Sequence, residues 1–289
     1  MDKKKPNLFI IGASKCGTTS LWHMLKQHTK IFMSTPKEPW FFSFSNYLSR
    51  LPEYEKLFER AKAEKFLGEA SPIYSETTLI PNLPQRIYNY NPNAKIIYIV
   101  REPISRLKSV WRQALSTTHW YYPVYKNYTD VEVPLMPKNF KKAIFEYPQF
   151  LEVCKYWTHL NHYRQYFDDK NILLLFFEDL KSNEEKVYRE ICKFLELEPE
   201  IKEGIFNIQN SGKGKKMYYS FILRLKKNNI IYKIGSTITK LLNIKIPKKP
   251  IKYNVHLDNK TIKEINSILK IEKIMILEYG HKKPDFWEK

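Results

Sequence analysis

The sequence predicts an α/β fold: a single domain in which helices flank both faces of a central parallel sheet. Residues 7–11, 95–100 and 171–177 form three apolar runs that indicate buried strands, and segments with helical spacing lie between them. Strands that are apolar along their whole length are typical of a parallel sheet covered on both faces. A chain of 289 residues with a hydrophobic share of 43% is large enough to build such a core.

The remaining elements of the core follow from the same periodicity. The short run Phe66-Leu67-Gly68 predicts a further strand. Apolar residues recurring at helical spacing predict helices over four stretches, and prolines interrupt the second of them. These stretches are 18–28, 79–90, 104–115 and 151–167.

Local signals define the last helix of the core and the segments around it. Ser182-Asn183-Glu184-Glu185 is a capping-box pattern, which predicts a helix running to about residue 195. Residues 116–138 are rich in Tyr, Pro and Thr and predict an irregular insertion. We therefore expect one domain over 1–289, with a core over about 7–216 and a basic, helical C-terminal part over about 217–289.

The net charge of +19 is unevenly distributed. Residues 213–289 hold 19 Lys and Arg against 6 Asp and Glu. One explanation is a lysine-rich genome, and the other is attraction to a polyanionic acceptor, an anionic membrane or nucleic acid. No nucleic-acid-binding motif accompanies the charge, so we do not expect nucleic acid as a partner.

The cysteines and the apolar runs indicate a cytoplasmic protein. The three cysteines are too few and too scattered to form a disulfide framework, which favours a reducing compartment. No apolar run approaches the roughly 18 residues of a membrane span. The first six residues lead directly into the first strand, so we expect no signal peptide.

The loop between the first strand and the first helix is a candidate phosphate site. Backbone N–H groups at a helix start attract anions, and small residues allow a close approach. A nucleotide kinase would show Gly-Lys-Ser/Thr at the loop's end, whereas here a threonine follows the second glycine and the lysine precedes it. The predicted binding residues are Lys15, Cys16, Gly17, Thr18, Thr19 and Ser20, with a solvated turn as the alternative.

A second candidate anion site follows the strand over 95–100. Arg101 stands at the carboxyl end of that strand, and Ser109 lies about two turns into the next helix. Carboxyl ends of parallel strands share one edge, so both residues are expected near Lys15. A fixed cation and a hydroxyl there can hold a second phosphate without a metal. Each residue alone is equally consistent with a structural role.

Taken together, these segments resemble the sulfotransferases that use 3′-phosphoadenosine 5′-phosphosulfate (PAPS), in particular the carbohydrate branch with the heparan sulfate enzymes and their bacterial relatives. The resemblance covers roughly residues 7–216 and implies the P-loop-like sulfotransferase fold. It rests on the order and spacing of six motifs. They are Lys15-Cys16-Gly17-Thr18-Thr19, Lys37-Glu38-Pro39-Trp40-Phe41-Phe42, Gly68-Glu69-Ala70-Ser71-Pro72-Ile73-Tyr74, Arg101-Glu102-Pro103 with Arg106 and Ser109, Phe177-Glu178-Asp179-Leu180 and Phe194-Leu195-Glu196-Leu197.

The resemblance implies how the donor is held. The Lys15 loop would wrap the 5′-phosphosulfate of PAPS, while Arg101 and Ser109 would hold its 3′-phosphate, with no metal. A basic segment after the last core helix would complete the site. Here that segment contains Lys213, Gly214 and Lys215, although a solvated basic loop explains it equally well.

Lys15 and Glu38 are the candidate catalytic residues. Lys15 is placed to stabilise the leaving phosphate. Glu38 is the candidate base, because its aromatic neighbours are expected to desolvate it and raise its pKa; the resemblance points to the same glutamate. The alternatives for Glu38 are a surface ion pair with Lys37 or another base. The other candidate bases are Glu69, His119, and His23 and His28, which are expected on a helix surface.

The acceptor is predicted only by class. Aromatic rings over 119–128 could stack on sugar faces, which favours a glycan or glycolipid acceptor. Residues 221–246 mix Ile and Leu with Lys at helical spacing, typical of a core-facing helix or of one lying on an anionic membrane. Ala70 stands where heparan sulfate enzymes carry a lysine, which argues against that acceptor. The alternative functions are an ATP-dependent small-molecule kinase and a non-catalytic polyanion-binding module.

Overall fold

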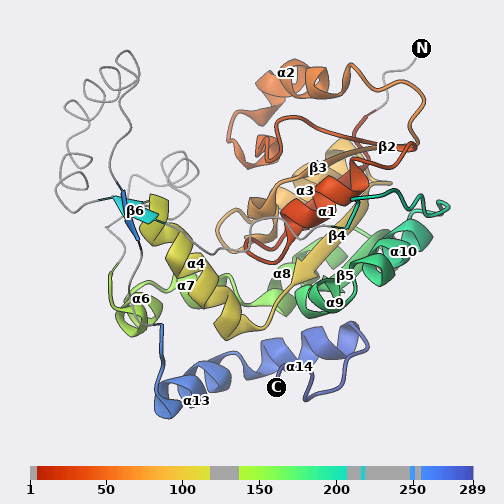
Figure 1. Cartoon of the computed structure of the whole chain (residues 1–289). Helices are drawn as coiled ribbons and strands as arrows, with labels where there is room; N and C mark the ends of the chain where they lie inside the picture. Colours follow the sequence, from red (N-terminus) through yellow and green to blue (C-terminus); the bar gives the residue numbers. More distant parts are fainter. Residues whose placement is uncertain (1–4, 118–136, 207–215, 219–247, 251–254, 289) are drawn as a thin grey trace.

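The computed structural model describes residues 5–117, 137–206, 216–218, 248–250 and 255–288 (Figure 1). Five parallel strands form its central sheet in the order β2-β3-β1-β4-β5, so the predicted parallel α/β architecture is confirmed. All five residues of the central strand β1 are buried. The sequence patterns do not predict β2, because three residues are too few to show a period. The strands are β1 (Leu8–Gly12), β2 (Ile31–Met33), β3 (Phe66–Ala70), β4 (Lys95–Val100) and β5 (Ile172–Phe176).

Helices cover both faces of this sheet. In Figure 1, α1 and α10 lie on the near face, and α3 and α8 lie on the far face. This is the arrangement that right-handed crossovers between parallel strands produce. The α-helices of this core are α1 (Thr18–Leu25), α2 (Leu51–Glu55), α3 (Leu83–Tyr90), α4 (Pro103–Thr117), α6 (Phe140–Glu146), α7 (Gln149–Glu152), α8 (Tyr156–Arg164), α9 (Phe177–Ser182) and α10 (Glu184–Phe194). The 3-10 turns are η1 (Phe41–Ser43), η2 (Tyr47–Arg50), η3 (Lys56–Phe58), η4 (Pro72–Ser75) and η5 (Asp169–Asn171).

Several predicted helix boundaries are wrong. The helix predicted over 18–28 ends at Leu25, and the helix predicted over 151–167 is two helices, α7 and α8. The predicted capping box is also misplaced by one residue. Asn183 caps α10 by accepting from the backbone N–H of Lys186 at 2.8 Å, because Ser182 is still the last residue of α9 and its hydroxyl donates to the Asp179 carbonyl.

The C-terminal part returns to the core. The short strands β6 (Lys216–Tyr218) and β7 (Lys248–Pro250) pair antiparallel beside α4 (Figure 1). Two helices follow, α13 (Asn259–Ile268) and α14 (Lys270–Tyr279), and α14 packs along α8. The stretch over 221–246, expected to be helical, lies outside the described residues.

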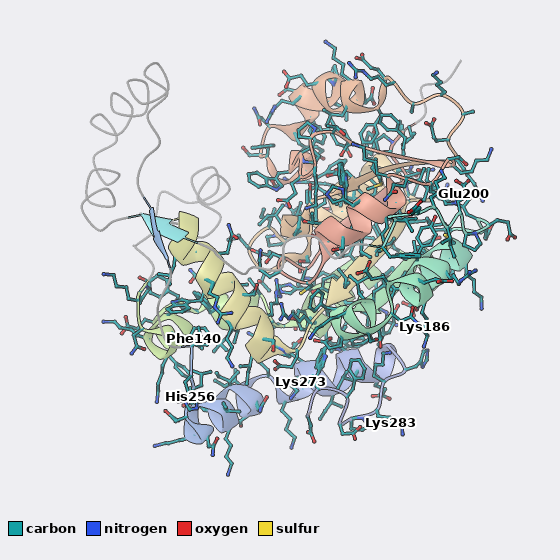
Figure 2. All side chains as sticks on the ribbon, viewed as in Figure 1. Phe140, Lys186, Glu200, His256, Lys273 and Lys283 are labelled. Carbon is teal, nitrogen blue, oxygen red and sulfur yellow. The ribbon has the colours of Figure 1, made fainter. Side chains whose placement is uncertain are left out.

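Side chains fill the space between the sheet and its helices, whereas exposed lysines such as Lys186 and Lys283 mark the surface (Figure 2). In the part of the chain that the structure describes, no helix is long and apolar enough to cross a membrane.

Candidate active site

The predicted phosphate loop connects β1 to α1 at the carboxyl edge of the sheet. Gly17 stands at the N-cap of α1 with a left-handed φ of 99°. A Cβ there would lie 2.8 Å from Leu180 Cδ2 and 3.0 Å from Phe177 Cδ2, so both the backbone and the packing require glycine. Lys15, at the tip of the loop, is half-buried and also left-handed, with φ 66°.

Arg101 lies against this loop. One guanidinium nitrogen, Nη1, donates to the Lys15 carbonyl oxygen at 3.3 Å. The guanidinium also stacks over the Phe177 ring at 4.6 Å, and Tyr156 Oη donates to the Arg101 carbonyl at 2.8 Å. The structure therefore brings together the two cations that the sequence places 86 residues apart. Both are only partly buried, so they can still meet an anionic ligand.

Arg106 fixes the loop from beneath, a role that the motif alone does not reveal. Its fully buried guanidinium donates from Nε to the Ser14 carbonyl at 3.0 Å and from Nη2 to the Ser14 hydroxyl at 3.3 Å. A third hydrogen bond runs from Nη1 to the Val153 carbonyl. The buried guanidinium therefore joins the phosphate loop to the connection between α7 and α8, and it adds positive charge beneath the loop.

Two carboxylates, those of Glu102 and Glu178, accept backbone hydrogen bonds at the start of α4. Glu102 accepts from the backbone N–H groups of Ile104 (2.8 Å) and Ser105 (2.6 Å), which caps the helix. Glu178 on α9 accepts from the Glu102 N–H at 3.0 Å. These three bonds fix the turn that directly follows Arg101, and none of them follows from the sequence pattern.

The other predicted donor residues differ in accessibility. Cys16, Thr18 and Ser20 are buried, with 0%, 5% and 1% of their surface exposed, and burial raises the pKa of the Cys16 thiol to about 11. Thr19 and Ser109 are half-buried, Ser109 in the second turn of α4. Lys213, Gly214 and Lys215 lie outside the described residues.

Glu38 is not desolvated as expected. Its side chain is 34% exposed and forms an ion pair with Lys37, which was the alternative reading of this motif. The backbone is unusual, because both Glu38 (φ 64°) and Trp40 (φ 55°) adopt the left-handed conformation. The aromatic neighbours turn into the core instead, where Phe41 stacks on Tyr54 with ring centroids 4.2 Å apart.

Glu69 is the buried glutamate of the site. It has no exposed surface and accepts hydrogen bonds from Tyr54 (2.7 Å), Ser71 (2.6 Å) and Tyr74 (3.0 Å). Burial raises the pKa of the Glu69 carboxyl to about 7, although the three hydroxyls oppose that shift. The desolvation expected for the base Glu38 is therefore found at Glu69. The oxygens of Glu69, however, face protein hydroxyls.

Of the two histidines expected on a helix surface, one is exposed and one is buried. His23 is exposed on α1, as expected. His28 is wrong as a surface residue: it lies beyond the end of α1 and is only 3% exposed. Its Nδ1 accepts from the Lys30 N–H at 3.0 Å, so Nε2 carries the proton and donates to the Glu198 carbonyl at 3.0 Å. His119 lies outside the described residues.

Among the described residues, no group of three or more His, Cys, Asp or Glu side chains is arranged to hold a metal ion. The cations at the loop are Lys15, Arg101 and Arg106, and the carboxylates of Glu102 and Glu178 lie at the turn that follows Arg101.

Curated relatives share part of the chain. The membrane-associated sulfotransferase kil1 of Dictyostelium discoideum is 32% identical over 152 residues, which cover 52% of this chain and 29% of kil1. The heparan sulfate glucosamine 3-O-sulfotransferase 5 of Mus musculus is 27% identical over 198 residues, covering 68% of this chain and 55% of the mouse enzyme. The chain thus spans only part of the length of these relatives.

Solved structures show the same fold. A sulfotransferase from Alicyclobacillus acidocaldarius superposes with a TM-score of 0.64 at 18% identity and covers 99% of this chain and 100% of its own. The sulfotransferase domain of the curacin biosynthetic pathway superposes with a TM-score of 0.50 at 15% identity, covering 93% of this chain and 99% of its own.

A family model agrees with the motifs. The model described as the sulfotransferase domain matches residues 5–222, which include the phosphate loop, β3, β4 and the start of α4. Heparan sulfate sulfotransferases of the carbohydrate branch are among the relatives, as the motifs predicted. The chain belongs to the sulfotransferase family.

Proposed function

We propose that this chain transfers a sulfuryl group from PAPS to a hydroxyl or amine of a carbohydrate. The observation that carries the proposal is the contact of Arg101 Nη1 with the Lys15 carbonyl, which makes one site of two strand ends. PAPS carries phosphate at both ends of its ribose, so it needs two such anion sites side by side. Membership of the sulfotransferase family supports the same reaction.

In the proposed reaction the acceptor oxygen or nitrogen attacks sulfur in line with the bridging oxygen. The new bond to sulfur forms as the sulfur–oxygen bond of the phosphosulfate breaks, and the 5′-phosphate leaves with the electron pair. Lys15 stabilises the charge that grows on this phosphate. Glu38 takes the proton that the acceptor loses. Arg101 and Ser109 hold the 3′-phosphate, together with Lys213, Gly214 and Lys215 from the following basic segment.

A carbohydrate acceptor is favoured by the relatives, several of which are named as heparan sulfate or carbohydrate sulfotransferases. Ala70, where the heparan sulfate enzymes carry lysine, favours a different glycan. A cytoplasmic location and a peripheral contact with anionic membrane, through which a glycolipid would be reached, are part of this proposal. The net charge of +19 supports such a contact.

A thermal-shift comparison tests the donor. 3′-Phosphoadenosine 5′-phosphate (PAP), AMP and Mg-ATP would each be added at the same concentration. We expect PAP to raise the melting temperature most, because a ligand that binds only the folded state stabilises it by mass action. Stabilisation by Mg-ATP but not by PAP would overturn the proposal and favour a kinase. Binding of heparin without either nucleotide would favour a polyanion-binding module.

A further inference from the structure

The cluster around Glu69 has no counterpart in the proposed reaction. Glu69 accepts hydrogen bonds from three hydroxyls, those of Tyr54 on α2, Ser71 after β3 and Tyr74 in η4. In the described part of the chain no Lys or Arg lies within ion-pair distance of its carboxylate. A fully buried carboxylate without a cation is rare, and here the three hydroxyls are its hydrogen-bond partners.

Two of these hydroxyls reach further, to the loop that carries Glu38. The Trp40 N–H donates to Ser71 Oγ at 3.1 Å, and the Phe42 N–H donates to Tyr74 Oη at 3.1 Å. Each hydroxyl has a single proton, and an ionised carboxylate can only accept. Glu69 therefore accepts a hydrogen bond from each hydroxyl proton, and the lone pairs of Ser71 and Tyr74 are left to accept from the two backbone N–H groups.

The loop needs such support because its backbone is strained. Glu38 and Trp40 both have left-handed φ values, 64° and 55°, which residues with a Cβ adopt only when the surroundings impose them. The bonds at Trp40 and Phe42 lie two and four residues after Glu38 in the chain. Arg86 continues the support by donating to the carbonyls of Phe42 (2.8 Å) and Phe44 (3.1 Å).

We propose that Glu69 is a positioning residue: it orients the hydroxyls of Ser71 and Tyr74, which hold the loop backbone and so aim the Glu38 carboxylate at the acceptor. This inference rests on the proposed function, in which Glu38 is the base. In this inference β3 has two roles. It pairs with β2 in the sheet, and the residues that follow its carboxyl end support the loop that follows β2.

This arrangement of hydrogen bonds requires Glu69 to be ionised. A protonated Glu69 would donate to one of its three hydroxyls, which would have to turn its own proton elsewhere. Burial raises the pKa of Glu69 to about 7. The titratable groups facing it are the four tyrosines whose pKa values are raised and which therefore stay neutral at that pH. They are Tyr54, Tyr74, Tyr90 and Tyr163.

Three hydroxyl deletions test the inference. Ser71→Ala and Tyr74→Phe each remove a hydroxyl that joins Glu69 to the loop. Tyr54→Phe is the control: among the described residues, the Tyr54 hydroxyl forms a hydrogen bond with Glu69 and none with the loop. With PAPS and a glycosaminoglycan oligosaccharide outside the heparan class, such as chondroitin, as the probe acceptor, we expect kcat to fall about 10- to 100-fold in the first two variants. PAP affinity should stay unchanged, and Tyr54→Phe should keep its kcat.

Hydrogen exchange gives a readout that needs no acceptor. Exchange at the Trp40 amide should accelerate in Ser71→Ala, and exchange at the Phe42 amide should accelerate in Tyr74→Phe, with neither changed in Tyr54→Phe. Equal loss of kcat in all three variants would overturn the inference, because the cluster would then act only through stability. Unchanged exchange and kcat in Ser71→Ala and Tyr74→Phe would also overturn it.

Double variants separate this inference from the proposed function. If Ser71 and Tyr74 act through Glu38, neither substitution lowers kcat further in a Glu38→Gln background. A further 10-fold loss in that background would show that the cluster acts elsewhere, and would overturn the inference alone. Full activity of Glu38→Gln itself would instead remove Glu38 as the base, and the proposed mechanism would fail first.

Discussion

At the scale of single residues, the two candidate catalytic side chains share a backbone conformation. Lys15 and Glu38 both have left-handed φ values, 66° and 64°, although neither is glycine. Residues held in this region cluster at functional sites, where the surroundings over-determine them. Here the surroundings are identifiable: Arg101 holds the carbonyl of Lys15, and the Glu69 cluster holds the residues that follow Glu38.

Glu38→Gln is expected to lower kcat by roughly 10²- to 10⁴-fold, the usual contribution of a general base. The amide keeps the size of the side chain but cannot take the acceptor's proton. Donor binding should not change, which calorimetry with PAP would check. The control is Glu53→Gln, at a glutamate whose side chain is 70% exposed and pairs with Arg50. A normal kcat in Glu38→Gln would exclude this residue as the base.

Glu76 is expected to make stability depend on pH. It is buried, one carboxyl oxygen has no hydrogen-bond partner among the described residues, and burial raises its pKa from 4.5 to about 8. The folded state therefore binds more protons than the unfolded state between these values. Stability from this group is complete below pH 4.5 and is lost as the pH rises through 8.

Glu76→Gln removes that titration and keeps the shape. Relative to the wild type, its free energy of unfolding should rise with pH by up to about 1.4 kcal/mol per pH unit between pH 5 and 8. Urea unfolding at each pH unit would measure this difference, with Glu203→Gln, at an exposed glutamate, as the control. Parallel pH curves for the wild type and Glu76→Gln would contradict the prediction.

At the scale of elements, the phosphate loop requires a glycine at position 17. Gly17→Ala would place a methyl 2.8 Å from Leu180 Cδ2 on α9, in addition to the strain of φ 99°. Gly204→Ala is a matched control, because Gly204 is also left-handed (φ 75°) but has no heavy atom within 4 Å of its Cβ position. We expect about 1–2 kcal/mol of destabilisation from strain in both variants. Only Gly17→Ala should also weaken PAP binding, measured by calorimetry; equal PAP affinity in both would contradict it.

The elements that the sequence predicted are those with a strong period. The runs over 95–100 and 171–177 are apolar after their first residues, Lys95 and Asn171, and they became β4 and β5 within one residue at each end. Helix ends were predicted less well, because a cap depends on backbone angles. Ser182 is still part of α9, and therefore the next residue, Asn183, caps α10. The strand assignments also predicted that Lys15 and Arg101 would meet, since the carboxyl ends of parallel strands share an edge of the sheet.

The support behind the site could not be predicted in the same way. Arg106 and Glu69 act through contacts between residues far apart in the chain, such as Arg106 with Ser14 and Tyr54 with Glu69. The aromatic motif around Glu38 suggested desolvation, but in three dimensions the rings of Phe41 and Phe42 turn into the core and leave the carboxylate partly exposed. A sequence pattern gives residue types and spacing, whereas burial depends on the direction of each side chain.

At the scale of the whole molecule, the C-terminal residues return to the candidate donor site. Trp287 is only 7% exposed and its indole Nε1 donates to Glu178 Oε2 at 3.2 Å. The other oxygen of Glu178 accepts from the Glu102 N–H, next to Arg101. Gly280 lies against Phe176, where a Cβ would come within 2.4 Å of the ring. We therefore propose that residues 255–288 fold as one unit with the core, which agrees with the predicted single domain.

Trp287→Phe tests this connection between the chain's end and the donor site. Phenylalanine keeps an aromatic ring against Phe176 and Tyr156 but removes the N–H that Glu178 accepts. We expect a loss of about 1.5–3 kcal/mol in the free energy of unfolding, measured in urea, because one hydrogen bond to a carboxylate is removed. We also expect weaker PAP binding, because Glu178 is then freer to move away from the turn that follows Arg101. Trp157→Phe is the control, since Trp157 packs on Tyr279 of α14. If both variants lose stability but bind PAP like the wild type, the C-terminal segment supports the fold without acting on the donor site.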